Sequence, residues 1–149
     1  MPGKPELVSK TQTFFNRHWY GGDEPPSWSF EWAWTGPVPN YRLGGLYALL
    51  KDDELIYVGL GNSRGGGIYK ERGISRRLES HVVDIAPAGS AVTYVPKQRW
   101  REAGVTQLAT LGFPEEFSYL SPALEDFLIG ELNPPQNSVR RRSPSLPTN

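Results

Sequence analysis

Two short apolar runs on either side of a polar turn constrain the fold of this chain more than any other feature of its sequence. The runs cover residues 44–50 and 55–60, and the turn between them is Lys-Asp-Asp-Glu. Apolar runs of this length, joined by a few polar residues, predict a β-hairpin. An antiparallel pair of strands is therefore expected at this position.

The alternation of side chains along these strands predicts how they pair. Each strand has one fully aliphatic face, made by Leu46, Ala48 and Leu50 in the first and by Ile56, Val58 and Leu60 in the second. Bringing these faces together requires a register with Tyr47 opposite Tyr57, because a slip of one residue moves every side chain to the other face. The pattern thus predicts two phenols side by side. Gly45 and Gly59 are expected to let the backbones approach closely.

The first 42 residues are rich in aromatic residues and proline. Within them, four aromatic residues alternate with small or polar ones, namely Trp28, Phe30, Trp32 and Trp34. This alternation predicts a strand with one aromatic face. Such a face is expected to be core, because large buried rings stabilise a small domain efficiently. Stacking on splayed nucleic-acid bases is the functional alternative.

After a glycine-rich loop, apolar residues recur at the spacing of a helix. They are Ile74, Leu78, Val82 and Ile85. A helix is expected there, with Arg77 and His81 four residues apart on one face beside the apolar stripe. Residues 91–95 are expected to form a third strand that ends at Pro96, and residues 97–111 a further helix.

A late helix is expected to begin at Ser121, with the serine as its cap and Pro122 in its first turn. Its apolar stripe consists of Leu124, Phe127, Leu128 and Leu132. Residues 133–135, Asn-Pro-Pro, end it. Glu125 is expected at the boundary of the core, where a carboxylate needs a partner. The basic tail from residue 138 is expected to be disordered.

Composition excludes several classes of function. The 149 residues fit one domain, and the lack of cysteine excludes disulfides, thiolate metal sites and a cysteine nucleophile. No apolar run is long enough for a membrane helix and no signal-peptide core is visible, so a cytoplasmic protein with no membrane partner is expected. The formal net charge is zero, but residues 62–80 carry five cations against two acids. This local excess is either a phosphate-binding patch or a solvated surface.

Six short pieces, in this order and spacing, resemble the GIY-YIG nuclease superfamily. They are Gly45-Leu46-Tyr47, Tyr57-Val58-Gly59, Arg77, His81, Glu125 and Asn137. The resemblance covers residues 44–137, with Leu46 and Val58 in place of the family's isoleucines. A literal Gly-Ile-Tyr at residues 67–69 lacks a Tyr-x-Gly at hairpin distance and is not expected to be the motif.

This resemblance implies an α+β fold in which helices flank a small three-stranded antiparallel sheet. Residues 43–137 would form the nuclease-like domain, residues 1–42 an aromatic extension packed on it, and residues 138–149 the tail. The implied reaction is metal-dependent hydrolysis of a phosphodiester, most directly in DNA. Glu125 would hold one Mg²⁺ or Mn²⁺, and Arg77 would clamp the phosphate.

The tyrosines would handle the attacking water. Tyr47 would act as general base or orient the water, and because a free phenol has a pKa of roughly 10, its proton would pass to His81 or to a metal-bound water. Tyr57 would position the water or the scissile phosphate. Asn137 would tie the end of the late helix to the hairpin. Further substrate contacts are expected in or beside the glycine-rich stretch, at Arg64, Lys70 and Arg76.

Two other functions stay open. One is a nucleic-acid-binding module with a nuclease-like fold and no cleavage, and the other is an interaction domain that uses its tryptophan face. A chain without catalysis would have no chemical reason to hold all five of the polar side chains Tyr47, Tyr57, Arg77, His81 and Glu125, which favours the nuclease. A restriction-type homodimer and a structure-selective or non-specific nuclease are both compatible with the sequence, as are DNA and RNA substrates.

Overall fold

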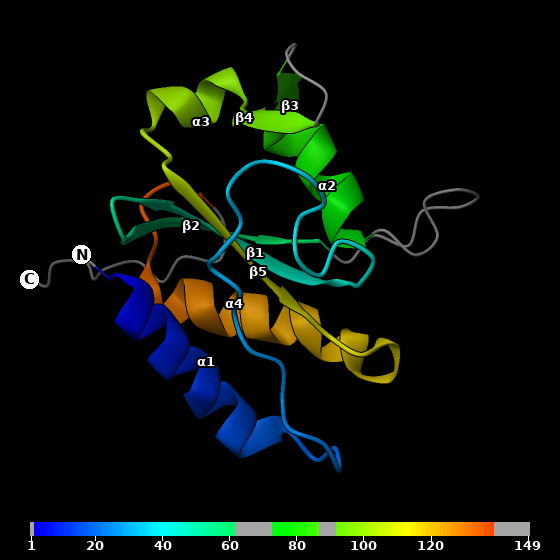
Figure 1. The fold of residues 1–149 in the computed structure, drawn as a ribbon. Helices are drawn as coiled ribbons and strands as arrows, with labels where there is room; N and C mark the ends of the chain where they lie inside the picture. The colour runs from blue at the N-terminus through cyan, green and yellow to red at the C-terminus, as the bar shows by residue number, and fades with distance from the viewer. Residues whose placement is uncertain (1, 62–72, 87–91, 139–149) are drawn as a thin grey trace, which may run out of the picture.

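A three-stranded antiparallel sheet lies between two layers of helices (Figure 1). The computed structural model describes residues 2–61, 73–86 and 92–138. The sheet has the order β2-β1-β5, with β1 at Gly45–Lys51, β2 at Glu54–Leu60 and β5 at Gln107–Gly112. The fold is therefore α+β with the small antiparallel sheet that the sequence predicted.

Each face of the sheet is covered by different elements. On one face lie α1 (Lys4–His18) and α4 (Ser121–Leu132), preceded by the 3-10 helix η2 (Glu115–Leu120). On the other face lie α2 (Gly73–His81), the two-stranded sheet of β3 (Val83–Ala86) and β4 (Thr93–Pro96), and α3 (Gln98–Glu102). Two buried clusters result, which we call the α1/α4 core and the α2 core. No helix among the described residues is long and apolar enough to cross a membrane.

The predicted hairpin forms, but its predicted register is wrong. Tyr47 pairs with Gly59, and Tyr57 pairs with Leu49. The pairing then shifts by one residue, so that Leu50 meets Leu55. Such a bulge allows Leu55, which simple alternation places beside Tyr57, to face the α1/α4 core instead. The two tyrosines are nevertheless neighbours on one face, as diagonal rather than opposite residues.

Helix α1 was not predicted from the sequence. It buries Leu7, Thr11, Phe14 and Phe15 against the α1/α4 core. Glu6 caps its start, where the backbone N–H of Gly3 donates to Oε1 of Glu6 at 2.8 Å. Because the polar Thr11 occupies one turn of the buried stripe, the apolar periodicity of this helix is interrupted in the sequence.

The alternating aromatic segment is not a strand, and its rings do not share a face. Its β-pairing consists of isolated bridges, from Ser29 to Thr110 and from Thr35 to Thr93. Trp28 and Phe30 pack against the α1/α4 core, whereas Trp32 and Trp34 belong with the α2 core. The segment thus passes the edge of β5 and supplies rings to both faces of the sheet, a path that alternation alone does not reveal.

Three further expectations are corrected. The helix expected to reach Ile85 ends at His81, and Ile85, 64 % exposed, lies in β3. The strand near residues 91–95 is β4, but it pairs with β3 in the separate sheet. The third strand of the main sheet is β5, which lies where a helix was expected, and α3 is only five residues long.

Helix α4 begins and ends where the sequence predicted, with one difference at its cap. The N-cap position is Leu120, and Ser121 instead donates its hydroxyl to the carbonyl oxygen of Ser118 at 2.6 Å. The helix stops at Asn133, whose φ of 47° is left-handed, a conformation that asparagine tolerates better than most residues. Of the predicted tail, residues 139–149 lie outside the described residues.

Candidate functional site

Tyr47 stands at the centre of the site that the sequence predicted. It lies on the middle strand of the sheet, faces the α2 core and is only 1 % exposed. Its ring lies across Gly59 on the neighbouring strand, and a β-carbon at residue 59 would collide with the end of the ring. The ring of Tyr57 lies beside it, with a centroid separation of 6.0 Å. Gly59 therefore makes the room in which the two phenols meet.

Helix α2 brings Arg77 to the same place. Ile74 and Leu78 bury the helix in the α2 core. Arg77 then hydrogen-bonds to the Tyr47 side chain. The acidic neighbours that might have paired with Arg77 are engaged elsewhere. Glu79 accepts from Ser75 at 3.0 Å and Asp84 from Lys97 at 2.6 Å.

The surroundings of Tyr47 hold its hydroxyl in the protonated form. Burial is the largest cause that raises the pKa of Tyr47 well above its ordinary value of 10.0, and the adjacent Tyr57 raises it further. The charge of Arg77 and its hydrogen bond to the Tyr47 oxygen act in the opposite direction. Burial disfavours a phenolate, so burial outweighs the cation here. At neutral pH, Tyr47 is a phenol that accepts a hydrogen bond from Arg77.

His81 lies one turn beyond Arg77, at the exposed end of α2. Partial burial first, and then the charges of Arg77 and Lys97, lower the pKa of His81 below its ordinary value of 6.5. The imidazole is therefore uncharged at neutral pH and can accept a proton. Its position is fixed through the backbone, because the indole N–H of Trp100 donates to the His81 carbonyl oxygen at 2.9 Å.

Trp100 is a site residue that sequence reasoning missed. It is 2 % exposed, and its ring lies 4.8 Å from the ring of Tyr57. The guanidinium of Arg99 lies 4.3 Å from the centre of the Trp100 ring. The chain thus places Tyr47, Tyr57 and Trp100 in one continuous row of rings, which ends in a cation at the surface. The Arg-Trp-Arg sequence at residues 99–101 was a visible signal, but only the fold shows that it reaches Tyr57.

Glu125 lies on α4, the helix that covers the other face of the sheet. It is 8 % exposed, and the residues one turn away from it on α4, Ser121, Leu128 and Ile129, are buried as well. Glu125 therefore lies within the buried face of α4. The sequence had instead suggested a position at the edge of the core. Since a charged side chain is costly to bury, this position requires compensating interactions.

Asn137 binds the backbone of β2. Its side-chain oxygen accepts from the Val58 N–H, and its side-chain N–H₂ donates to the Val58 carbonyl oxygen, both at 2.9 Å. The backbone N–H of Gln136 donates to Ile56 at 2.9 Å. The segment after α4 is thereby fastened to the strand on either side of Tyr57. This is the tie between late helix and hairpin that the resemblance implied.

Two of the remaining predicted residues, Gly45 and Arg76, lie in the described part of the chain. Gly45 closely approaches β5, where a β-carbon would collide with the Leu111 carbonyl oxygen. Arg76 is partly buried on α2. Arg64 and Lys70, predicted to contact substrate, lie outside the described residues. The structure thus brings Tyr47, Tyr57, Arg77 and His81 together on the α2 face, while Glu125 and Asn137 arrive with α4.

The donor set suits one kind of metal ion. Within residues 2–61, 73–86 and 92–138, no three side chains of His, Cys, Asp or Glu gather into a cluster. Zinc sites usually have three or four such ligands. A site with one carboxylate ligand, such as Glu125 could supply, suits Mg²⁺ or Mn²⁺, which keep several waters and add a phosphate oxygen from the substrate.

Comparison of the chain with models of known protein families, with curated proteins and with solved structures gives no match.

Proposed function

We propose that this protein is a divalent-metal-dependent nuclease of the GIY-YIG type, which hydrolyses phosphodiester bonds in DNA. The observation that carries the proposal is the contact between Arg77 and the buried Tyr47, with Tyr57 alongside. If Arg77 only supported the fold, an acidic side chain would serve equally well as its partner. Here Arg77 meets a hydroxyl, a group that can orient water beside a phosphate.

In this proposal Arg77 binds the scissile phosphate. A guanidinium has five N–H donors, more than one tyrosine oxygen can engage, so Arg77 could bind phosphate oxygens while it contacts Tyr47. Because Arg77 carries its charge at any physiological pH, it stabilises the negative charge that grows in the transition state. Lysine at this position would keep the charge but lose the planar fork.

Tyr47 orients the attacking water, and Tyr57 supports it from the neighbouring strand. The raised pKa of Tyr47 favours orientation over direct proton abstraction, because a phenol that stays protonated is a poor base. In the hydrolysis, the water oxygen forms a bond to phosphorus while the bond from phosphorus to the leaving oxygen breaks. His81, uncharged at neutral pH, is the protein group suited to receive the water's proton.

Glu125 is the proposed ligand of Mg²⁺ or Mn²⁺. When bound, the ion would withdraw electrons from the phosphate and stabilise the leaving oxygen. Asn137 supports this arrangement by holding the segment after α4 on β2, close to Tyr57. Arg99, exposed beside Trp100, would offer a further cation to flanking phosphates.

The decisive experiment is cleavage of supercoiled plasmid with Mg²⁺, Mn²⁺ or EDTA. Two variants are compared, each matched with a control of the same chemistry at the surface. They are Tyr47→Phe with Tyr119→Phe, and Glu125→Gln with the adjacent Asp126→Asn. Tyr119 is 66 % exposed and Asp126 is exposed as well. Circular dichroism and thermal unfolding show whether each variant is folded.

Metal-dependent cutting that is lost in Tyr47→Phe and Glu125→Gln but kept in both controls supports the nuclease. Discrete products would indicate sequence specificity, and a smear would indicate its absence. Binding of single-stranded or branched DNA without cutting would replace the nuclease by a binding module. If the protein neither cuts nor binds DNA, the remaining function is that of a protein-interaction domain.

A further inference from the structure

The N-terminal segment and α2 enclose a hollow that the proposed reaction does not use. Its volume is about 330 Å³, and its lining includes Trp32, Val38, Tyr41, Leu78, Glu79 and Tyr94. Small-ligand sites have about this volume and are mostly apolar, with a few polar groups that fix orientation. Glu79 and Arg77 lie two residues apart on α2, so their side chains leave the helix in widely different directions. The hollow and the phosphate clamp therefore lie on different flanks of one helix.

The aromatic wall of this hollow is held in place before any ligand arrives. The ring of Trp32 lies 5.5 Å from that of Tyr94 and 5.1 Å from that of Trp34. Two backbone hydrogen bonds attach the segment to β4 and the residue before it, from Tyr94 to Trp34 at 2.7 Å and from Gly36 to Val92 at 2.9 Å. Trp34 has a φ of 65°, a left-handed conformation that is rare and unfavourable for a tryptophan. Such strain is often found where a ligand is bound.

Glu79 indicates what kind of ligand fits. Its carboxylate is steadied by the Ser75 hydroxyl at 3.0 Å and can only accept hydrogen bonds. A ligand must therefore present an N–H or O–H donor, and a phosphate would be repelled. A flat ring with an amino group satisfies both the aromatic wall and the carboxylate, as the amino groups of nucleobases do.

We propose that this hollow binds one unpaired, amino-bearing base of the nucleic acid that the protein cuts. The inference rests on the proposed nuclease function and adds a substrate class, a nucleic acid with a single-stranded or bulged nucleotide. When Arg77 binds a phosphate of the strand, a nearby base of the same strand would enter the hollow on the other flank of α2. A base that is already unpaired enters most readily, because no base pair has to be broken.

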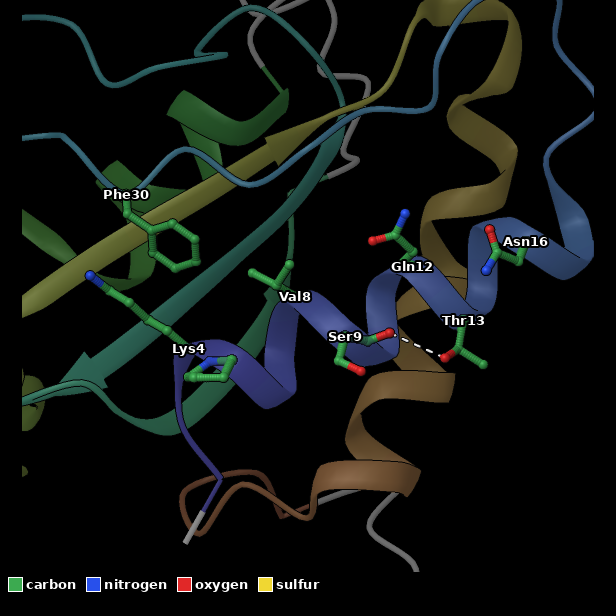
Figure 2. A pocket seen from close by; sticks show the side chains of 8 residues that line it. Lys4, Val8, Ser9, Gln12, Thr13, Asn16 and Phe30 are labelled. Carbon is green, nitrogen blue, oxygen red and sulfur yellow. Dashed lines mark hydrogen bonds between the residues drawn. The ribbon is translucent and has the colours of Figure 1, made fainter.

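A second, larger hollow does not have this chemistry. It measures about 690 Å³ and runs along α1, on the other side of the sheet from Tyr47 (Figure 2). Amide and hydroxyl side chains such as Gln12, Thr13 and Asn16 line it. Its one aromatic ring, Phe30, has the Lys4 ammonium 4.9 Å from its centre, which takes up the face that a base would stack on.

The test measures base binding separately from cutting. The full chain is titrated in EDTA against a duplex with one bulged 2-aminopurine, whose fluorescence falls when it stacks on an aromatic ring, and against the fully paired duplex. We expect quenching and tighter binding for the bulged duplex only. Tyr94→Ser should weaken this binding by roughly 5- to 150-fold, the range of base–aromatic stacking. The exposed Tyr119→Ser should leave it unchanged.

Glu79→Lys is the second variant, since it replaces the acceptor by a donor near the surface and should also abolish the preference for the bulge. Free 2-aminopurine riboside shows whether the base alone suffices or the strand is needed. Equal binding of both duplexes, an absence of quenching, or binding that is indifferent to Tyr94 and Glu79 would overturn the inference. If the protein cuts plasmid but its binding does not depend on Tyr94 and Glu79, the nuclease proposal stands and the base-binding proposal fails. If 2-aminopurine is quenched but plasmid is not cut with Mg²⁺, the base-binding site stands and the nuclease proposal fails.

Discussion

The ring of Tyr47 occupies the space that a β-carbon on Gly59 would need. The two residues are paired across β1 and β2, so the hairpin register and the site depend on the same contact. Because Tyr47 is 1 % exposed and packed in the α2 core, its ring has little room to move away. Gly59 has a low intrinsic propensity for strands, but the site requires a glycine at this position.

Gly59→Ala is predicted to destabilise the protein by about 1–3 kcal/mol, the usual cost of overpacking a core, and to abolish nuclease activity. Urea unfolding and plasmid cleavage measure the two effects. Gly22→Ala is the matched control, because a β-carbon there meets no atom within 4 Å. In a Tyr47→Ala background, the cost of Gly59→Ala should largely disappear, since the ring is gone. A cost that stays the same in both backgrounds would show that the clash does not cause it.

The pKa of His81 provides a prediction that does not require activity. NMR titration should place it below 6.5, and Lys97→Gln should raise it, because the variant removes one of the positive charges that disfavour imidazolium. The Asp84 carboxylate, released from its 2.6 Å pair with Lys97, acts in the same direction. Lys10→Gln, on the far side of the sheet, is the control and should leave the titration unchanged. A downward shift in Lys97→Gln would contradict the electrostatic picture of the site.

Tyr47 should make the protein sensitive to alkaline pH. Its folded-state pKa is raised above the unfolded value of about 10, so the unfolded chain loses this proton first as pH rises. The resulting stability is fully present below pH 10 and is lost progressively above it. Denaturant unfolding from pH 8 to pH 11 should therefore show a steeper loss in the wild type than in Tyr47→Phe. Parallel curves would mean that Tyr47 titrates normally.

The parts of the fold that sequence reasoning found are those with a local signal. The hairpin at residues 44–60 has two apolar runs around a turn, and the turn residues Asp52 and Asp53 take the positive φ values of 48° and 71° that suit a two-residue hairpin turn. Helix α4 has an unbroken apolar stripe, a proline in its first turn and a stop at residues 133–135. Tyr47 and Tyr57 could be placed side by side because they lie on the hairpin, and Arg77 and His81 because they lie one turn apart on a helix with a visible apolar spacing. The resemblance alone joined the two pairs.

The parts that sequence reasoning missed depend on contacts between distant residues. The hairpin bulge is favoured by the α1/α4 core, which takes Leu55, and by the fit of Tyr47 over Gly59. Strand β5 pairs with β1, about sixty residues earlier in the chain, and its own sequence is compatible with a helix. The tryptophans around the left-handed Trp34 divide between two cores. None of these relationships leaves a periodic pattern in a single segment.

Trp100 is predicted to be a positioning residue that acts through Tyr57. Trp100→Phe removes the indole hydrogen bond to the His81 carbonyl oxygen and shrinks the ring that lies 4.8 Å from Tyr57. The expected loss of stability is about 1–3 kcal/mol, because a partly buried hydrogen bond is lost and a ring buried in the α2 core becomes smaller. Cleavage should fall by about tenfold or more in kcat, with a smaller change in KM, since small shifts of a positioned group are costly to catalysis.

Trp19→Phe separates positioning from mere stability. Trp19 also donates its indole N–H to a backbone carbonyl, that of Asp23 at 2.8 Å, but it packs with Phe15 and Phe117 on the α1/α4 side of the sheet. Its replacement should reduce stability without changing kcat at a temperature where the protein stays folded. If both tryptophan variants lowered kcat equally, Trp100 would be a core residue and no more. If only Trp100→Phe did so, the row of rings from Trp100 to Tyr47 would have a role in catalysis, because the two variants lose the same kind of hydrogen bond.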